Sequence, residues 1–196
     1  MRFHPILIAA LASAAAASST VAADIEAGKA RAEPCAACHG ENGVSEMPNT
    51  PSLAAQPDGF IQWQLVYFRS GKRKNEIMEP IAAELSDDDV RNLAAYFASL
   101  PPPAPAAETD SSPELTEAGG MLTQQHRCTS CHKENFSGQQ ATPRLAGQRE
   151  DVLLKSLQDY KSGVRTGAGL AAMPEAVRPL SPKDLEALAH YLARLP

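Results

Sequence analysis

Two copies of the pattern C-x-x-C-H contain every cysteine of this chain. Each copy brings two thiols and one imidazole together, and the residues are Cys35, Cys38, His39, Cys128, Cys131 and His132. Cysteines three residues apart on one helical turn can form thioethers with the two vinyl groups of a haem, and the next histidine then lies beneath the iron as an axial ligand. The pattern therefore predicts two covalently bound haem c groups, each held by a cysteine pair and ligated by a histidine.

Three other uses of the cysteines compete with haem attachment. Four cysteines in an exported chain can form two disulfides. A thioredoxin-like dithiol also uses C-x-x-C, but it needs no following histidine and belongs to a βαβ fold with one reactive pair. A zinc site needs cysteine pairs that share one ion, whereas these pairs lie 93 residues apart. The histidine after each pair favours haem.

A haem iron held by one histidine needs a sixth ligand if it is to carry electrons without binding other molecules, and methionine is the candidate. Met78 lies 39 residues after His39, and Met173 lies 41 residues after His132. Both precede the final helix of their half and lie near a proline, Pro80 or Pro174, whereas Met47 is too close to its histidine to return across the haem face. We expect Met78 and Met173 to ligate iron; the alternative is that each fills a core.

The second nitrogen of a ligating imidazole usually donates its hydrogen to a fixed acceptor. Pro51 and Pro143 lie 12 and 11 residues after the two motif histidines, at the head of a repeated P-x-L-A-x-Q. We expect their carbonyls to be these acceptors, although each proline would also suit a simple turn. His126 and His190, outside the motifs, are expected to be surface residues rather than ligands.

The chain is a duplicated module, because segments of the first half recur in the second at offsets of 91 to 95 residues. A Glu-Ala-Gly precedes each motif, and an aromatic residue followed by a basic residue, Ser and Gly comes after each P-x-L-A-x-Q. The repeated segments begin at Glu26 and Glu117, at Pro51 and Pro143, at Phe68 and Tyr160, and at Leu85 and Leu180.

A proline-rich segment separates the two copies. Residues 101–113 contain five prolines, which exclude a helix and favour a semi-extended, solvated spacer. A single core around the whole chain would have to bury this spacer with its unpaired carbonyls. The sequence therefore predicts two domains, residues 24–100 and 114–196, joined by a Pro-rich linker.

Apolar residues within each copy follow helical spacing and no alternating strand is evident, so the predicted fold class is all-α. Ser86 and Ser181 are serine N-caps with an acidic residue three positions on, and they predict the start of each final helix. These helices are expected to stop before Pro101 and Pro196. The other expected elements are helices from Asp58 to Arg69 and from Glu150 to Lys161, and a short first helix capped by Asp24.

The amino terminus has the pattern of a secretory signal peptide, residues 1–23. Arg2 precedes an apolar run, and small residues lead to Ala23, after which cleavage is expected. An uncleaved anchor is the alternative, but the run falls short of the about 20 apolar residues that span a bilayer. The mature protein is expected to be soluble outside the cytoplasm.

Charge excludes one class of function. The 196 residues carry a formal net charge of -5 with a pI near 5.5, whereas a nucleic-acid binder carries a basic face. Residues 24–100 hold 7 basic and 12 acidic side chains, and residues 114–196 hold 10 and 9. This asymmetry can steer different partners to the two ends, or it is a solvated acidic face without such meaning.

Each half, with C-x-x-C-H, a downstream P-x-L and a late methionine before an amphipathic helix, resembles class I cytochrome c. Two such modules in one exported chain, with G-x-R at residues 71–73 and 163–165, resemble the dihaem cytochrome c4 family. The resemblance covers residues 24–196 apart from the spacer. Two departures are Lys133, where glycine follows the first motif, and Pro174, which follows Met173 directly.

The resemblance implies a bacterial periplasmic electron carrier, with His39 and Met78 on one iron and His132 and Met173 on the other. The implied partners are redox proteins: a membrane respiratory complex, a terminal oxidase or a periplasmic dehydrogenase, with peripheral membrane association left open. Saturated irons predict a carrier rather than an enzyme. Two alternatives stay open: a dedicated cytochrome subunit of one dehydrogenase, and a dihaem peroxidase in which one iron drops its sixth ligand.

Overall fold

The computed structural model describes residues 22–106, 112–166 and 172–196, so most of the expected signal peptide lies outside the described residues. These ranges hold helices and one isolated β-bridge, between Gln139 and Thr142, but no strand. None of their helices is long and apolar enough to cross a membrane. The predicted all-α class is confirmed. In chain order the elements are α1 (Ile25–Arg31), η1 (Glu33–Cys35), α2 (Ala36–His39), α3 (Asp58–Arg69), α4 (Met78–Ala83), α5 (Asp87–Ser99), α6 (Pro113–Gln125), α7 (Thr129–His132), α8 (Glu150–Ser162), α9 (Ala172–Val177) and α10 (Pro182–Ala193).

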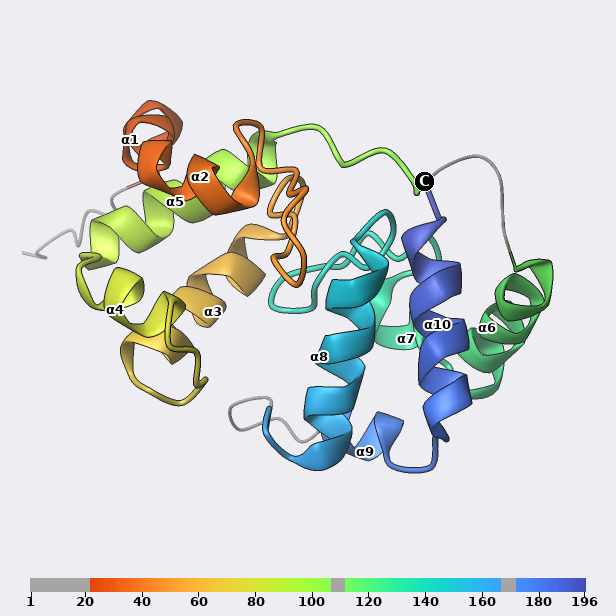
Figure 1. Ribbon diagram of the computed structural model, residues 1–196. Helices are drawn as coiled ribbons and strands as arrows, with labels where there is room; N and C mark the ends of the chain where they lie inside the picture. The colour runs from red at the N-terminus through yellow and green to blue at the C-terminus, as the bar shows by residue number, and fades with distance from the viewer. Residues whose placement is uncertain (1–21, 107–111, 167–171) are drawn as a thin grey trace, which may run out of the picture.

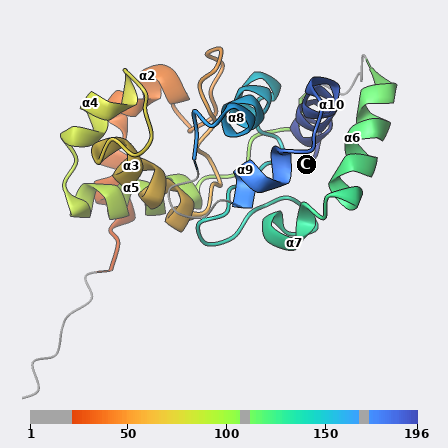
Figure 2. The same ribbon diagram turned by 90° about the horizontal axis from the view of Figure 1, so that it is seen from below.

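The helices form two bodies of the same design. Helices α1 to α5 lie on one side and α6 to α10 on the other, and the segment after α5 passes between them (Figures 1 and 2). In each body the first helix packs against the last, α1 against α5 and α6 against α10, and α3 or α8 also packs on that last helix. The duplication in the sequence is therefore a duplication of the fold.

A glycine lies at each crossing of the first and last helix. A Cβ atom on Gly28 would lie 2.1 Å from the carbonyl oxygen of Asn92, and one on Gly119 would lie 2.3 Å from that of Ala187. A residue without a Cβ lets the two helices approach this closely. The repeated Glu-Ala-Gly thus marks the helix crossing.

The predicted helix starts are confirmed. Ser86 and Ser181 each accept a hydrogen bond from the N–H three residues on, and the acidic side chain there accepts one from the serine N–H in return. Asp24 caps α1 by accepting from the N–H of Ala27. Helix α3 has the predicted bounds, and α8 continues one residue further, to Ser162.

Apolar faces of these helices build a separate core in each body, as the periodicity predicted. The buried residues of the N-terminal core are Ala32, Ile61, Leu85, Val90, Leu93, Ala94 and Phe97. Two adjoining clusters form the C-terminal core, from Phe136, Ala146, Leu153, Ala189, Leu192 and Ala193, and from Val177, Leu180, Leu185 and Leu188.

The proline-rich segment differs from the expected solvated spacer. Its prolines 101, 102 and 105 are exposed, but Pro103 is buried. The Ala106 N–H donates to the Ala193 carbonyl at 3.0 Å, and the Pro103 carbonyl lies close to Gly147. The described part of the linker is therefore fastened to the C-terminal body, because Pro103 and one backbone hydrogen bond hold it there.

Candidate functional site

Each C-x-x-C-H motif lies on a single helical turn. Cys35 and Cys128 stand at the N-cap positions of α2 and α7, and the motif histidine ends each helix. No disulfide joins any of the four cysteines. Burial raises the pKa of the Cys35 and Cys128 thiols. In the described ranges no three His, Cys, Asp or Glu side chains gather as a metal site. The geometry is the one that attachment to two vinyl groups requires.

Both motif histidines are buried and hold the same partner. Nδ1 of His39 lies 2.8 Å from the carbonyl oxygen of Pro51, and Nδ1 of His132 lies 2.9 Å from that of Pro143. Burial lowers the pKa of each imidazole, and the carbonyl acts in the opposite direction. A neutral imidazole that donates its Nδ1 hydrogen leaves the lone pair of Nε2 for a metal. The two imidazoles are therefore prepared to act as ligands.

The turn after each histidine is tied back to the motif. The Ser45 hydroxyl donates to the carbonyl of Cys38 at 2.8 Å, and the Gln139 amide donates to that of Cys131 at 3.2 Å. The residue directly after each histidine has a positive φ, 81° at Gly40 and 66° at Lys133. The departure noted in the sequence thus places lysine in a conformation that favours glycine.

The two candidate methionines occupy equivalent places. Met78 is the first residue of α4, where its N–H donates to the Asn75 side chain at 2.8 Å, and Met173 lies in the first turn of α9. Both side chains are half-buried. Helix α4 packs on α3 as α9 packs on α8. Met173 also packs against the apolar cluster that contains Val177, so it contributes to a core as well.

The expectation of a surface position is wrong for His190. Its side chain is 3% exposed, because α10 packs between α6 and α8. Nδ1 of His190 lies 3.3 Å from a carboxylate oxygen of Glu150, whose other oxygen accepts from Arg194 at 2.7 Å. His126 is half-buried at the end of α6. His190 thus belongs to a polar cluster that joins α8 to α10.

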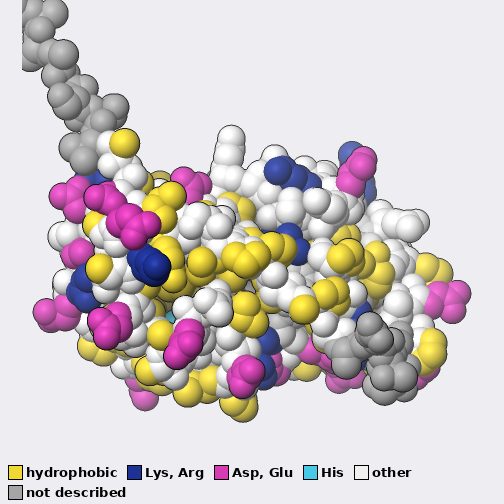
Figure 3. All heavy atoms as spheres, turned by 90° about the horizontal axis from the view of Figure 1, so that it is seen from above, with side chains coloured by type: hydrophobic (Ala, Val, Ile, Leu, Met, Phe, Trp, Pro, Cys, Tyr) yellow, Lys and Arg dark blue, Asp and Glu magenta, His cyan; other side chains and the backbone are white. Residues whose placement is uncertain are grey.

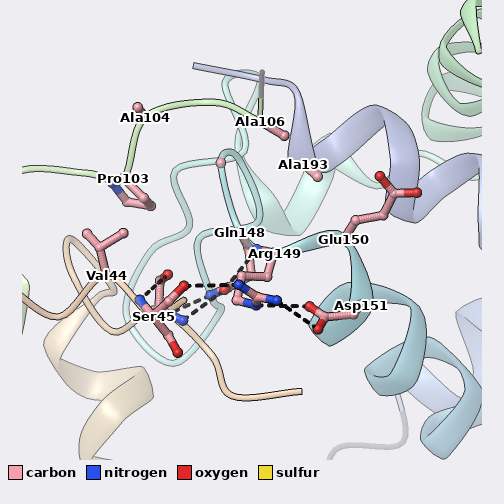
Figure 4. A pocket seen from close by; sticks show the side chains of 12 residues that line it. Val44, Ser45, Pro103, Ala104, Ala106, Gln148, Arg149, Glu150, Asp151 and Ala193 are labelled. Atoms are coloured by element: carbon pink, nitrogen blue, oxygen red, sulfur yellow. Dashed lines mark hydrogen bonds and ion pairs between the residues drawn. The ribbon is translucent and has the colours of Figure 1, made fainter. Parts of the chain in front are cut away.

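A cavity of about 460 Å³ lies where the two bodies and the linker meet (Figure 4). Beside it, the Arg149 side chain forms an ion pair with Asp151 at 3.0 Å and donates to the carbonyl of Ser45 in the other body at 3.2 Å. Asp151 in turn accepts from the N–H of Asn49 at 2.8 Å. The sequence offered no signal for the contacts of Arg149 with Ser45 and of Asp151 with Asn49, because they join residues about 100 positions apart. The cavity's lining residues are Val44, Ser45, Ser52, Pro103, Ala104, Ala106, Gly147, Gln148, Arg149, Glu150, Asp151 and Ala193.

Two arginines, one from each body, meet at a single acceptor. The Gln64 side-chain oxygen accepts from Arg73 at 2.7 Å and from Arg165 at 3.1 Å. Each guanidinium also stacks on an aromatic ring, at 4.6 Å from the centroid of Phe68 or of Tyr160. Burial and, next, the charge of Arg165 lower the pKa of Arg73 to about 9. No carboxylate in the described ranges forms an ion pair with either group.

The duplicated architecture matches known proteins over nearly all its length. The family model described as cytochrome c matches residues 25–101 and again residues 116–196. Cytochrome c4 of Azotobacter vinelandii is 35% identical over 193 residues, which cover 89% of this chain and 90% of the relative. The chain belongs to the dihaem cytochrome c4 family. This confirms the predicted class, with two tandem cytochrome c domains, two haem c groups and the role of an electron carrier.

Two further relatives extend the comparison within and beyond cytochrome c4. The crystal structure of reduced recombinant cytochrome c4 from Pseudomonas stutzeri is similar with a TM-score of 0.82 and 34% identity, over 89% of this chain and 100% of that one. A thiosulfate dehydrogenase electron acceptor of Stutzerimonas stutzeri is 33% identical, over 82% of this chain and 78% of the relative.

The residues present fit the haem groups of a cytochrome c4. Paired thiols and a neutral imidazole supply the attachment and one ligand in each domain. Haem also carries propionate carboxylates, and guanidinium groups bind carboxylates well because both are planar and oppositely charged. Arg73 and Arg165 lie close together, and no carboxylate in the described part of the chain forms an ion pair with them, so they match that demand.

Proposed function

We propose that this chain is a periplasmic carrier that passes single electrons from respiratory complexes or dehydrogenases to a terminal oxidase. The observation that carries the proposal is the pair of matched centres: cysteine pair, buried histidine on a proline carbonyl, and methionine on a short later helix. Haem, when bound, supplies the one-electron chemistry of its iron. The chain supplies the ligands and shields the centres from water.

In this proposal His39 and Met78 would hold one haem iron, and His132 and Met173 would hold the other. Each imidazole is fixed in the tautomer that offers Nε2, because Nδ1 faces a proline carbonyl. Two protein ligands on one iron leave no position for a substrate, which suits a carrier. Arg73 and Arg165 are proposed to bind propionates and to hold the two domains together at this point.

The domains of the mature protein are proposed to be residues 24–100 and 114–196, after export and cleavage behind Ala23. The linker, residues 101–113, then joins them. Support for export comes from the composition of residues 1–23. Mass spectrometry of the mature protein tests both points, since it gives the new amino terminus and the mass of two haem groups together.

A replacement of each methionine tests the ligand assignment. In Met78→Ala we expect the absorbance band of methionine-bound iron to halve and one reduction potential to fall by more than about 0.1 V, because axial ligands span about 0.8 V. Met173→Ala should likewise halve the band, by removing the contribution of the C-terminal haem. The matched control is Met121→Ala, which replaces an exposed methionine and should change neither. Retention of the full band in both variants would contradict the assignment.

A second candidate function is that of a dedicated electron acceptor for one dehydrogenase. The similarity to a thiosulfate dehydrogenase electron acceptor favours it. The domains also differ in charge, and Figure 3 shows Asp and Glu side chains gathered at the end formed by the N-terminal domain. Such a face can steer a basic partner at low ionic strength.

Stopped-flow kinetics distinguish the two functions. A dedicated acceptor should be reduced quickly by one dehydrogenase, such as thiosulfate dehydrogenase with thiosulfate, and hardly by a membrane respiratory complex. A general carrier should react with both and be oxidised by membranes that contain a terminal oxidase. In either case the rate should fall as salt screens the acidic face.

A further inference from the structure

The two glutamines that close the repeated P-x-L-A-x-Q each bind the opposite domain. Gln148 accepts from the N–H of Ser52 at 2.9 Å and donates to its carbonyl at 2.8 Å. Gln56 accepts from the N–H of Arg144 at 3.0 Å and donates to its carbonyl at 2.9 Å. Ser52 and Arg144 are equivalent in the repeat, as the glutamines are. All four hydrogen bonds are buried, and the contacts that they make between the domains are reciprocal.

Each glutamine contacts the same peptide group that serves a motif histidine. The carbonyl of Pro51 and the N–H of Ser52 are the two ends of one peptide unit. The carbonyl lies 2.8 Å from Nδ1 of His39, and the N–H is bound by Gln148. The Pro143–Arg144 unit lies in the same way between His132 and Gln56. One amide therefore separates each histidine from a side chain of the other domain.

A peptide unit transmits a hydrogen bond from one end to the other. Acceptance of the N–H by Gln148 polarises the amide and increases the negative charge on the Pro51 oxygen, and the low dielectric of the buried interface strengthens this effect. A stronger acceptor at Nδ1 makes the imidazole a more basic ligand. A more basic ligand stabilises oxidised iron, so loss of the glutamine should raise the reduction potential.

We propose that Gln148 and Gln56 are crossed positioning residues. Gln148, from the C-terminal domain, tunes the N-terminal haem through His39, and Gln56 tunes the C-terminal haem through His132. The proposal rests on the histidine ligation proposed above. Its consequence is that docking of the two domains sets both potentials, since each centre is completed by a side chain of the other domain.

Single replacements in the holoprotein test the crossed pattern. Methionine keeps the length of glutamine but makes neither hydrogen bond. In Gln148→Met we expect the reduction equilibrium of the N-terminal haem to shift two- to four-fold toward iron(II), about 20 to 35 mV at 59 mV per tenfold for one electron. The C-terminal haem should keep its potential. Gln56→Met should shift the C-terminal haem by the same amount and leave the potential of the N-terminal haem unchanged. A redox titration followed by NMR resolves the haem methyl signals of each domain.

Two further variants distinguish a direct effect on the reduction potential from a weaker domain interface or a loss of folding. Asp151→Asn removes the ion pair with Arg149 and weakens the interface contact with the Asn49 N–H but touches neither peptide unit, and it should leave both potentials unchanged. Gln148→Glu keeps an acceptor for the Ser52 N–H, so the N-terminal potential should stay at or below that of the wild type. Three results for Gln148→Met would overturn the proposal: a shift in the potential of the C-terminal haem alone, an equal shift in both potentials, or no shift in either.

The result is separable from that of the proposed function. A methionine-bound iron band of full intensity in Gln148→Met, without a crossed shift, overturns the tuning and leaves the carrier intact. If the wild-type protein itself lacked that band, the methionine ligation on which the carrier proposal depends would be contradicted, whatever Gln148→Met showed.

Discussion

Lys133 has a backbone conformation that is nearly confined to glycine. Its φ of 66° and ψ of 163° match those of Gly40 at the equivalent place, 81° and 151°. Residues other than glycine in this region cost about 1 to 3 kcal/mol. The chain tolerates the cost because the helical turn before Lys133 and the loop after it fix the direction of the backbone.

Replacement of this lysine should therefore stabilise the protein. Lys133→Gly relieves the backbone strain of the folded state. Glycine also increases the conformational entropy of the unfolded chain, which offsets part of this stabilisation, so we expect a net increase of about 1 kcal/mol in the free energy of unfolding. Thermal unfolding of the holoprotein measures it. The control is Gly40→Ala, whose new Cβ would lie 2.0 Å from the Val44 carbonyl and should destabilise the protein. A lower melting temperature for Lys133→Gly would contradict the strain argument.

At the scale of single residues, the attachment motifs and the two prolines could be chosen from sequence, because spacing restricts the chemistry. His190 could not be placed correctly. A polar residue among apolar ones in a helix is usually exposed, and only the packing of α8 beside α10 brings Glu150 to it. Arg73 and Arg165 lay within a repeated G-x-R, but their shared acceptor Gln64 belongs to helix α3, and no local pattern joins it to Arg165.

Neighbouring glycines of α6 offer a test of helix packing. Gly119→Ala would press a methyl group against the Ala187 carbonyl and should cost about 2 to 3 kcal/mol of stability, in the range of overpacked cores. Gly120→Ala is the matched control, since its Cβ would lie 3.4 Å from the Tyr191 ring and alanine favours helix by up to about 1 kcal/mol. Denaturant unfolding of both variants measures the contrast. Equal effects would show that the crossing is not close-packed.

Helices were the most predictable elements, for a local reason. A serine cap, an acidic residue three positions on and a helical apolar spacing are all encoded within one turn or two, and both capping boxes formed as predicted. The short helices α4 and α9 were not predicted. Six residues are too few for a periodic signal, and their packing on α3 and α8 decides them.

The contact that Asp151 makes with the other domain depends on the pH. Burial alone would raise the pKa of Asp151, but the bonds from Arg149 and from the Asn49 N–H outweigh it and lower the pKa. A carboxyl whose pKa is lower in the folded state stabilises the fold above its unfolded pKa of about 4, and this contribution is lost as the pH falls through the lower folded value.

We therefore expect the interface near Asp151 to loosen as the pH falls below about 4. Hydrogen exchange at the Asn49 amide, which donates to Asp151, should accelerate relative to amides within each core. Asp151→Asn should show the faster exchange already at neutral pH. Asp87→Asn is the control, because its ion pair with Arg69 lies within one domain. Equal protection at Asn49 in wild type and Asp151→Asn at neutral pH would contradict this.

The arginine pair should influence both haem groups at once. Removal of a positive charge near a haem disfavours the added electron, so Arg165→Gln should lower both potentials, at least two-fold in the reduction equilibrium. A redox titration measures the change, and Arg178→Gln, on the surface of the C-terminal domain, is the control. A fall confined to one haem would show that the pair serves a single centre.

At the scale of the whole molecule, sequence reasoning found the duplication but not the way the copies meet. The proline-rich segment predicted separation, and the composition gave no reason for Pro103 to be buried. Gln56 and Gln148 were visible as repeated letters, yet a repeat within one chain does not reveal that each copy binds the other. Such information exists only once both copies are folded.

The reciprocal glutamine contacts have the logic of an isologous dimer, in which one surface binds its own equivalent. Nothing in them requires a covalent tether between the partners. A one-haem ancestor with this surface would already pair with itself through the same four bonds, and fusion of two genes would then preserve the pairing while freeing each half to diverge in charge.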